Sequence, residues 1–217
     1  WPGLSNSSSN PDNMSLGIWA DRATYDLDIT GTPGDGQVSS FANAMVSVNY
    51  DVSAPWPSSS NGISVTYSGT GDIADGSNWA QSQAGAGGAT TSSTVQVQDS
   101  INSTDDVGSP GSQSPFSGTA TSGLLITEIM YNPRSSSDND FEWVEVFNNT
   151  GSSIDFAATP HFLDDKSDSS LTGGNIASGS VADGATAVLF SDSVLTAQNM
   201  QDIWAVSYTH LTLPTKA

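Results

Sequence analysis

The chain has 217 residues, of which 23 are acidic and four are Lys or Arg, and the resulting net charge of −19 repels nucleic acids and anionic membranes. The absence of cysteine excludes disulfides and thiolate zinc sites. Such a charge is typical of disordered chains, but six Trp and five Tyr indicate a folded, aromatic core with long polar loops.

Alternating runs of branched and aromatic residues predict short strands along the first part of the chain. These strands are expected at residues 16–19, 25–29, 44–50, 63–67 and 95–97. Turns rich in proline, glycine or asparagine separate them, and a low-complexity Gly/Ala/Ser/Thr segment covers residues 84–94. Residues 108–111 close this region, and a Ser/Thr/Gly/Pro linker follows at 112–122.

The most strand-like part of the chain comes next, at residues 124–131 and 141–147. Both runs are nearly apolar on their two faces, which predicts a pair of strands in the middle of a sandwich. Trp143 lies within the second run, so we expect its side chain to be buried. Further strands are expected at 152–156, 161–165 and 181–190.

The central pair also carries a family resemblance. Residues 126–133 (ITEIMYNP), followed by residues 141–148 (FEWVEVFN), resemble the opening of a lamin-tail domain of the bacterial secreted type. The resemblance implies an immunoglobulin-like β-sandwich that serves as an accessory module of larger extracellular proteins, and it does not imply an enzyme. His161 and Phe162 depart from the family's usual Gly-Trp, and Asp183-Gly184 replaces its Pro-Gly.

The order of the motifs suggests a domain organisation. Residues 124–205 resemble the first half of a lamin-tail domain, and residues 1–111 resemble the second half of a preceding copy. The marks of that second half are Leu4-Ser5-Asn6, Tyr50 with Pro55-Trp56-Pro57, Ser77-Asn78-Trp79 and Ser109-Pro110-Gly111. We therefore expect tandem copies in a parent protein. Residues 1–111 and 123–205 would pack as one circularly permuted sandwich, or else stay loose as unpartnered halves.

Residues 206–217 differ in amino-acid composition from the Asp/Ser/Gly-rich chain before them. They resemble a translated sequencing-adapter tail, and we therefore expect a non-native extension that takes no part in the fold. The alternative is a genuine final strand.

One acidic segment is a candidate calcium site. Asp138, Asp140 and Glu142 place carboxylates at alternate positions of an expected loop that enters a strand, and Ca²⁺ prefers such oxygen ligands. The spacing and glycine of an EF-hand are missing, so a solvated acidic turn is the alternative. No other cofactor is indicated.

The chain has only three Glu, namely Glu128, Glu142 and Glu145, and all three lie in the central strand pair. Their longer carboxylates suit either a cation or ligand contact, or buried acceptors of backbone N–H groups, and we favour the second.

Two tryptophans in expected loops, Trp56 and Trp79, could stack on sugars, or each could plug an open end of the sandwich. Only His161 and His210 could serve a Ser/His/Asp triad, and no Gly-x-Ser-x-Gly elbow accompanies them. We expect His161 to be a strand residue with one face towards solvent.

The expected function is therefore that of a non-catalytic, secreted or cell-surface module, a spacer or binding domain that works with the neighbouring domains of its parent protein. The alternative is a carbohydrate- or matrix-binding module, with polysaccharide as partner and calcium as an aid. A nucleic-acid partner and a membrane span are not expected.

Overall fold

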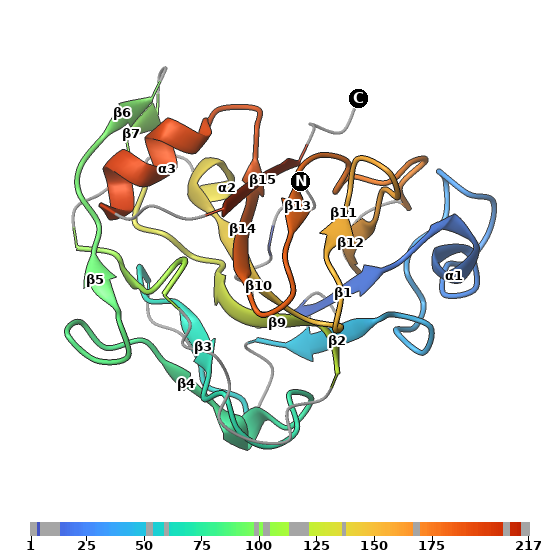
Figure 1. The fold of residues 1–217 in the computed structure, drawn as a ribbon, viewed down its shortest axis with the longest axis horizontal. Coiled ribbons are helices and arrows are strands. Elements are labelled where there is room, and N and C mark those ends of the chain that lie inside the picture. Colours follow the sequence, from blue (N-terminus) through green and yellow to red (C-terminus); the bar gives the residue numbers. More distant parts are fainter. Residues whose placement is uncertain are drawn as a thin grey trace.

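The computed structural model describes residue 4 and residues 14–50, 54–58, 61–97, 100–101, 105–112, 122–135, 138–166, 170–205 and 209–213. The chain is all-β, with two larger sheets that pack against each other (Figure 1). The smaller of these sheets is antiparallel and has the order β12-β1-β2. Its strands are β1 (Ser15–Trp19), β2 (Val46–Asn49) and β12 (Phe162–Asp165).

The larger sheet has six strands in the order β15-β14-β10-β9-β3-β4. Its strands are β3 (Val65–Tyr67), β4 (Trp79–Gln81), β9 (Gly123–Met130), β10 (Trp143–Asn149), β14 (Thr186–Ser191) and β15 (Thr209–Leu213). Three two-stranded ribbons complete the β structure: β5 (Thr90–Thr91) with β8 (Val107–Gly108), β6 (Gln96–Val97) with β7 (Ser100–Ile101), and β11 (Ile154–Asp155) with β13 (Ser180–Val181).

The expected central pair is present as the antiparallel strands β9 and β10, which lie between β14 and β3. Their register pairs Trp143 with Met130 at one end and Asn149 with Gly123 at the other. The register shifts by one residue next to Glu145, so that Thr127 forms a β-bulge. Every residue from Leu124 to Met130 is buried, as the apolar pattern on both faces predicts.

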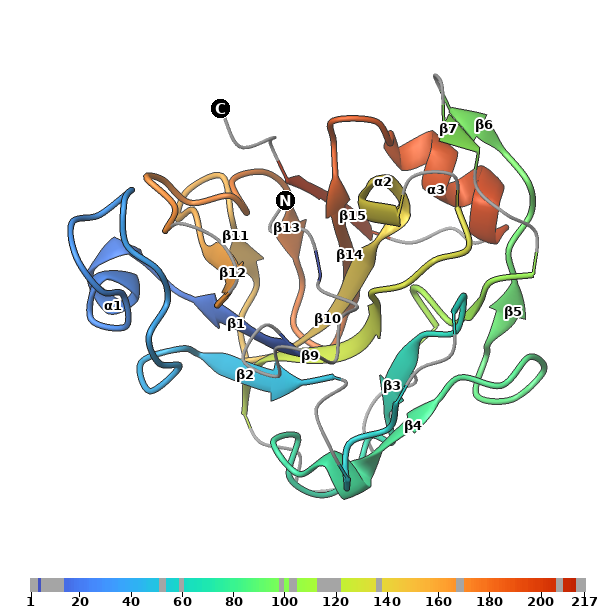
Figure 2. The same cartoon turned by 180° about the vertical axis from the view of Figure 1, so that it is seen from behind.

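Apolar side chains cover both faces of each larger sheet. The main core lies between the sheets and joins Leu16 and Val48 to Ile126 and Val144. On the far face of the six-stranded sheet, helix α3 (Ala197–Trp204) packs over Trp143. Helix α1 (Arg22–Asp26) covers the outer face of the smaller sheet, at the opposite end of the molecule from α3 (Figure 2).

Each of these sheets contains strands from both parts of the chain. In the smaller sheet, β12 pairs with β1, and in the larger sheet β9 pairs with β3 (Figure 2). Residues 1–111 and 123–205 therefore pack together as one layered unit instead of forming two loose halves. Most of the expected linker, residues 113–121, lies outside the described residues.

Several elements differ from the sequence-based expectation, among them residues 25–29 and 206–217. The strand expected at residues 25–29 is instead helix α1, because the Asp21 side chain caps it by accepting a hydrogen bond from Thr24 N at 2.9 Å. Ile29 makes only an isolated bridge to Val38. Residues 209–213, which were expected to take no part in the fold, form strand β15, which lies parallel to β14 and is connected to it through α3.

Candidate functional site

The candidate calcium residues do not form the expected loop. Asp138 and Asp140 belong to helix α2 (Asp138–Phe141), and Glu142 follows it directly. The Glu142 side chain is buried and its Oε2 accepts a hydrogen bond from Leu4 N at 2.8 Å. The side chain of Asp138 is not among those described. Within the described part of the chain, no group of three or more His, Asp or Glu residues is arranged to hold a metal ion.

The two candidate sugar-stacking tryptophans lie together, with ring centroids 5.7 Å apart. Trp79 is not in a loop as expected but begins strand β4, and only 5% of its surface is exposed. Its Nε1 donates to Ile73 O at 2.8 Å, so its polar edge is also satisfied inside the fold. Trp56 covers Trp79 and is itself only half-buried. Trp79 is therefore a core residue, and Trp56 retains some exposed surface.

His161 is buried, contrary to the expectation of a solvent-exposed face. Its ring packs edge-on against Phe156, with centroids 4.9 Å apart, and its Nδ1 lies 2.8 Å from Thr159 O. Burial lowers the pKa of this imidazole, which favours its neutral form. His210 lies in β15, and its side chain is outside the described residues.

The most unusual polar feature is a pair of buried carboxylates at the centre of the larger sheet. Glu128 on β9 and Glu145 on β10 are direct cross-strand partners, and both are fully buried. Residues directly opposite on neighbouring strands face the same side of a sheet. Because the cross-strand partners Trp143 and Met130 lie two positions further along, the two carboxylates share the face that α3 covers.

Glu128 is surrounded by hydrogen-bond donors. Its Oε1 accepts from Ser109 N at 2.9 Å, from Ser82 Oγ at 3.1 Å and from Ser64 Oγ, and its Oε2 accepts from Ser109 Oγ at 2.5 Å. Burial raises the pKa of Glu128, and these donors act against that rise because they stabilise the charged form.

Glu145 has fewer donors than Glu128. Its Oε2 accepts from Gly111 N at 2.6 Å, and its Oε1 accepts from Thr127 Oγ1 at 2.7 Å. Burial, together with the neighbouring charge of Glu128, raises the pKa of Glu145 to about 8. Both carboxyl groups therefore favour the protonated, neutral form more than an exposed glutamate does, and they titrate as a coupled pair.

Other buried carboxylates are also used to hold the fold together. Asp28 accepts hydrogen bonds from Trp19 Nε1, Ser40 Oγ and both nitrogens of Asn43, at 2.7–2.8 Å. These donors lower its pKa against the opposing effect of burial, which is the largest single contribution. Asp28 thus joins strand β1 to the loop before β2.

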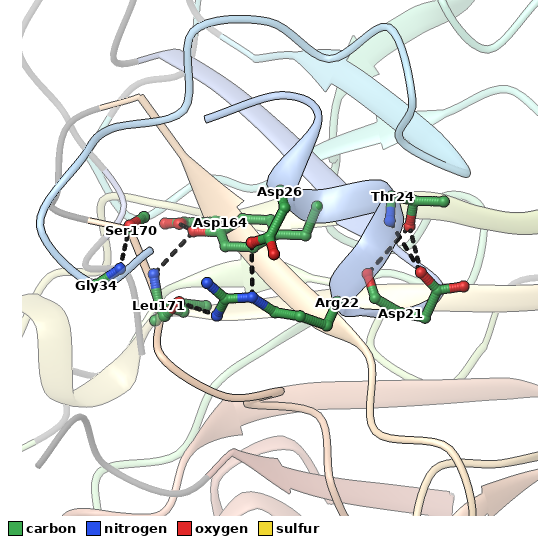
Figure 3. A network of polar contacts seen from close by, with 9 residues as sticks. Asp21, Arg22, Thr24, Asp26, Gly34, Asp164, Ser170 and Leu171 are labelled. Carbon is green, nitrogen blue, oxygen red and sulfur yellow. Dashed lines mark hydrogen bonds and ion pairs between the residues drawn. The ribbon is translucent and has the colours of Figure 1, made fainter. Parts of the chain in front are cut away.

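A second polar network joins α1 to the segment after β12 (Figure 3). Arg22 pairs with Asp26 at 2.6 Å and donates to Leu171 O at 2.7 Å. The Tyr25 hydroxyl donates to Asp164 and accepts from Leu171 N. Burial, followed by the charge of Asp164, raises the pKa of Tyr25, which keeps it a neutral donor. The network ties residues far apart in sequence and leaves Tyr25 protonated.

No family model matches the chain, and the comparisons with curated proteins and with solved structures give no match either. Among the described residues, no helix has the length and apolar character needed to cross a membrane.

Sequence reasoning identified the three Glu as candidates for buried, hydrogen-bonded acceptors, and the structure confirms this for all of them. It missed the direct pairing of Glu128 with Glu145, which depends on the register of β9 and β10.

Proposed function

We propose that the chain is a non-catalytic module of the lamin-tail type, with an immunoglobulin-like topology, that acts as a spacer or binding domain in a larger secreted or cell-surface protein. The observation that carries the proposal is the structural role of the three glutamates in the motifs that resemble a lamin-tail domain. Glu128, Glu142 and Glu145 are buried acceptors within the fold, so they serve its architecture.

The layered arrangement supports the same proposal. The resembling motifs fall on β9 and β10, the two strands at the centre of the larger sheet. Residues 1–111 supply β3, which pairs with β9, and β1, which pairs with β12, as expected if they are the second half of a permuted module. A folded unit of this kind keeps its neighbours at a defined distance, whereas a disordered linker of equal length does not.

The spacer role is tested by placing the chain between two fluorescent reporter domains. Single-molecule energy transfer should give a narrow distance distribution for this fusion and a broad one for a Gly/Ser linker of equal length. An equally broad distribution for a folded chain would overturn the spacer role. The non-catalytic role is tested with ester, glycoside and peptide substrates. It would be overturned if the unaltered chain turned one of them over and a folded Glu128→Gln variant did not.

A carbohydrate- or matrix-binding module is the second candidate, because Trp56 is partly exposed beside the buried Trp79. A polysaccharide and glycan array, read with calcium and with chelator, tests this candidate. Binding that Trp56→Ala abolishes and Leu27→Ala retains would support it, since Leu27 is another exposed apolar residue. Equal signals for both variants and for the unaltered chain would exclude Trp56 as the contact.

A further inference from the structure

The buried glutamates lie at the junction between two parts of the chain, here called the first segment (residues 1–111) and the second segment (residues 123–205). All three belong to the second segment, and each accepts a hydrogen bond from the first. The donors from the first segment are Leu4 N to Glu142, Ser64 Oγ, Ser82 Oγ, Ser109 N and Ser109 Oγ to Glu128, and Gly111 N to Glu145.

Backbone and arginine contacts reinforce the same junction. Strand β9 of the second segment pairs with β3 of the first, and β12 pairs with β1. Arg134 donates from its Nε to Asn61 O at 2.9 Å and from its backbone N to Asp106 Oδ1 at 3.0 Å. Asp28 provides a contrast, because its side chain accepts from Trp19, Ser40 and Asn43, which all lie within the first segment.

We propose that the second segment carries a docking surface for the first segment of another copy of this chain, with Glu128, Glu142 and Glu145 as its recognition points. The occupant is identified by what already sits there: strands that complete both sheets, and amide and hydroxyl donors that meet the buried carboxylates. A sequence without those donors leaves the carboxylates buried and unsatisfied, and the surface therefore discriminates against it.

In an intact chain, the linker holds the first segment at a high effective concentration near the second segment. The first segment therefore packs on the second segment of its own chain. Exchange between copies becomes possible when the covalent link between the segments is cut. It also becomes possible where neighbouring copies are fused in one protein. The same contacts then operate between chains.

The test starts from the full chain with a protease site placed between residues 112 and 122. After cleavage, the two pieces should still elute together on size exclusion. When cut protein with a fluorescent first segment is mixed with unlabelled cut protein, the label should move to the unlabelled second segments. Separation of the pieces on cleavage, or failure of the label to exchange over days, would overturn the proposal.

A double-mutant cycle shows whether the glutamates are the recognition points. Ser109→Ala removes a hydroxyl donor across the junction, and Glu128→Gln removes the charge of the carboxylate that this donor meets. Their combined effect on the dissociation constant should fall short of the product of the single effects by about fivefold or more. Asp28→Asn with Ser109→Ala is the matched control, and its effects should multiply. Independent effects for Glu128 and Ser109 would refute the role of Glu128, and Ser109→Ala keeps the test readable if Glu128→Gln does not fold.

Discussion

Raising the pH from 6.5 to 8 should lower the free energy of unfolding of this chain, and Glu145→Gln should make that dependence shallower. Burial and the charge of Glu128 raise the pKa of Glu145 from its ordinary value of 4.5 to about 8. Between these values the folded state holds a proton that the unfolded state has lost. Stability is therefore greatest at or below about pH 4.5 for this group, falls as the pH rises, and levels off above about pH 8.

The expected size follows from the pKa difference. A rise in the pKa of Glu145 from 4.5 to about 8, at about 1.4 kcal/mol per pKa unit, corresponds to a loss in the free energy of unfolding on the order of 5 kcal/mol over the whole pH range. About 2 kcal/mol of this loss falls between pH 6.5 and 8. The upper part of the pH range is the least affected by His161. Burial lowers the pKa of this imidazole, so its opposite dependence is largest below about pH 6.5 and becomes small by about pH 7.5.

Urea unfolding followed by far-ultraviolet circular dichroism at pH 6.5, 7, 7.5, 8 and 9 measures this dependence. Ionic strength is held constant, because the net charge of −19 makes repulsion within the chain sensitive to salt. The Glu145→Gln slope should be smaller by up to about 1.4 kcal/mol per pH unit. Asp28→Asn, which removes a buried carboxylate of lowered pKa, should keep the original slope. Stability that stays level or rises from pH 6.5 to 8, or equal slopes for Glu145→Gln and the unaltered chain, would refute the reasoning.

Three further outcomes are expected. Trp143→Ala should lower the free energy of unfolding by about 3–5 kcal/mol in urea titrations, because the ring is fully buried and packs edge-on against Trp204 at 5.6 Å; a loss under about 1 kcal/mol would contradict it. Gly108→Ala should cost about 1–3 kcal/mol in the same assay, since a Cβ there would lie 2.9 Å from the Trp143 ring, whereas Gly173→Ala, with nothing within 4 Å, should be nearly neutral. Melting temperatures should be equal in excess Ca²⁺ and in chelator, because Glu142 already accepts from Leu4 N; a rise with calcium that Asp140→Asn removes would instead support the calcium hypothesis.

Much of the central architecture could be predicted because it depends on local pattern. Alternation and near-continuous apolar runs at residues 124–131 and 141–147 are sufficient to predict two buried strands, and they appear as β9 and β10. The burial of Trp143 follows from the same pattern. Helix α1 was missed because residues 25–29 alternate like a strand while the deciding cap, Asp21, lies just outside the run.

The sequence by itself determined the all-β class, the two central strands, the presence of Glu128 and Glu145 within them and that of Glu142 directly before the second. It did so because side-chain periodicity is a local property of the chain. Only the tertiary structure decided that Glu128 faces Glu145, that most of their donors come from residues 64–111, and that Tyr25 meets Asp164. These contacts depend on strand register and on segments distant in sequence, and a shift of one residue in register would turn either carboxylate to the opposite face of the sheet.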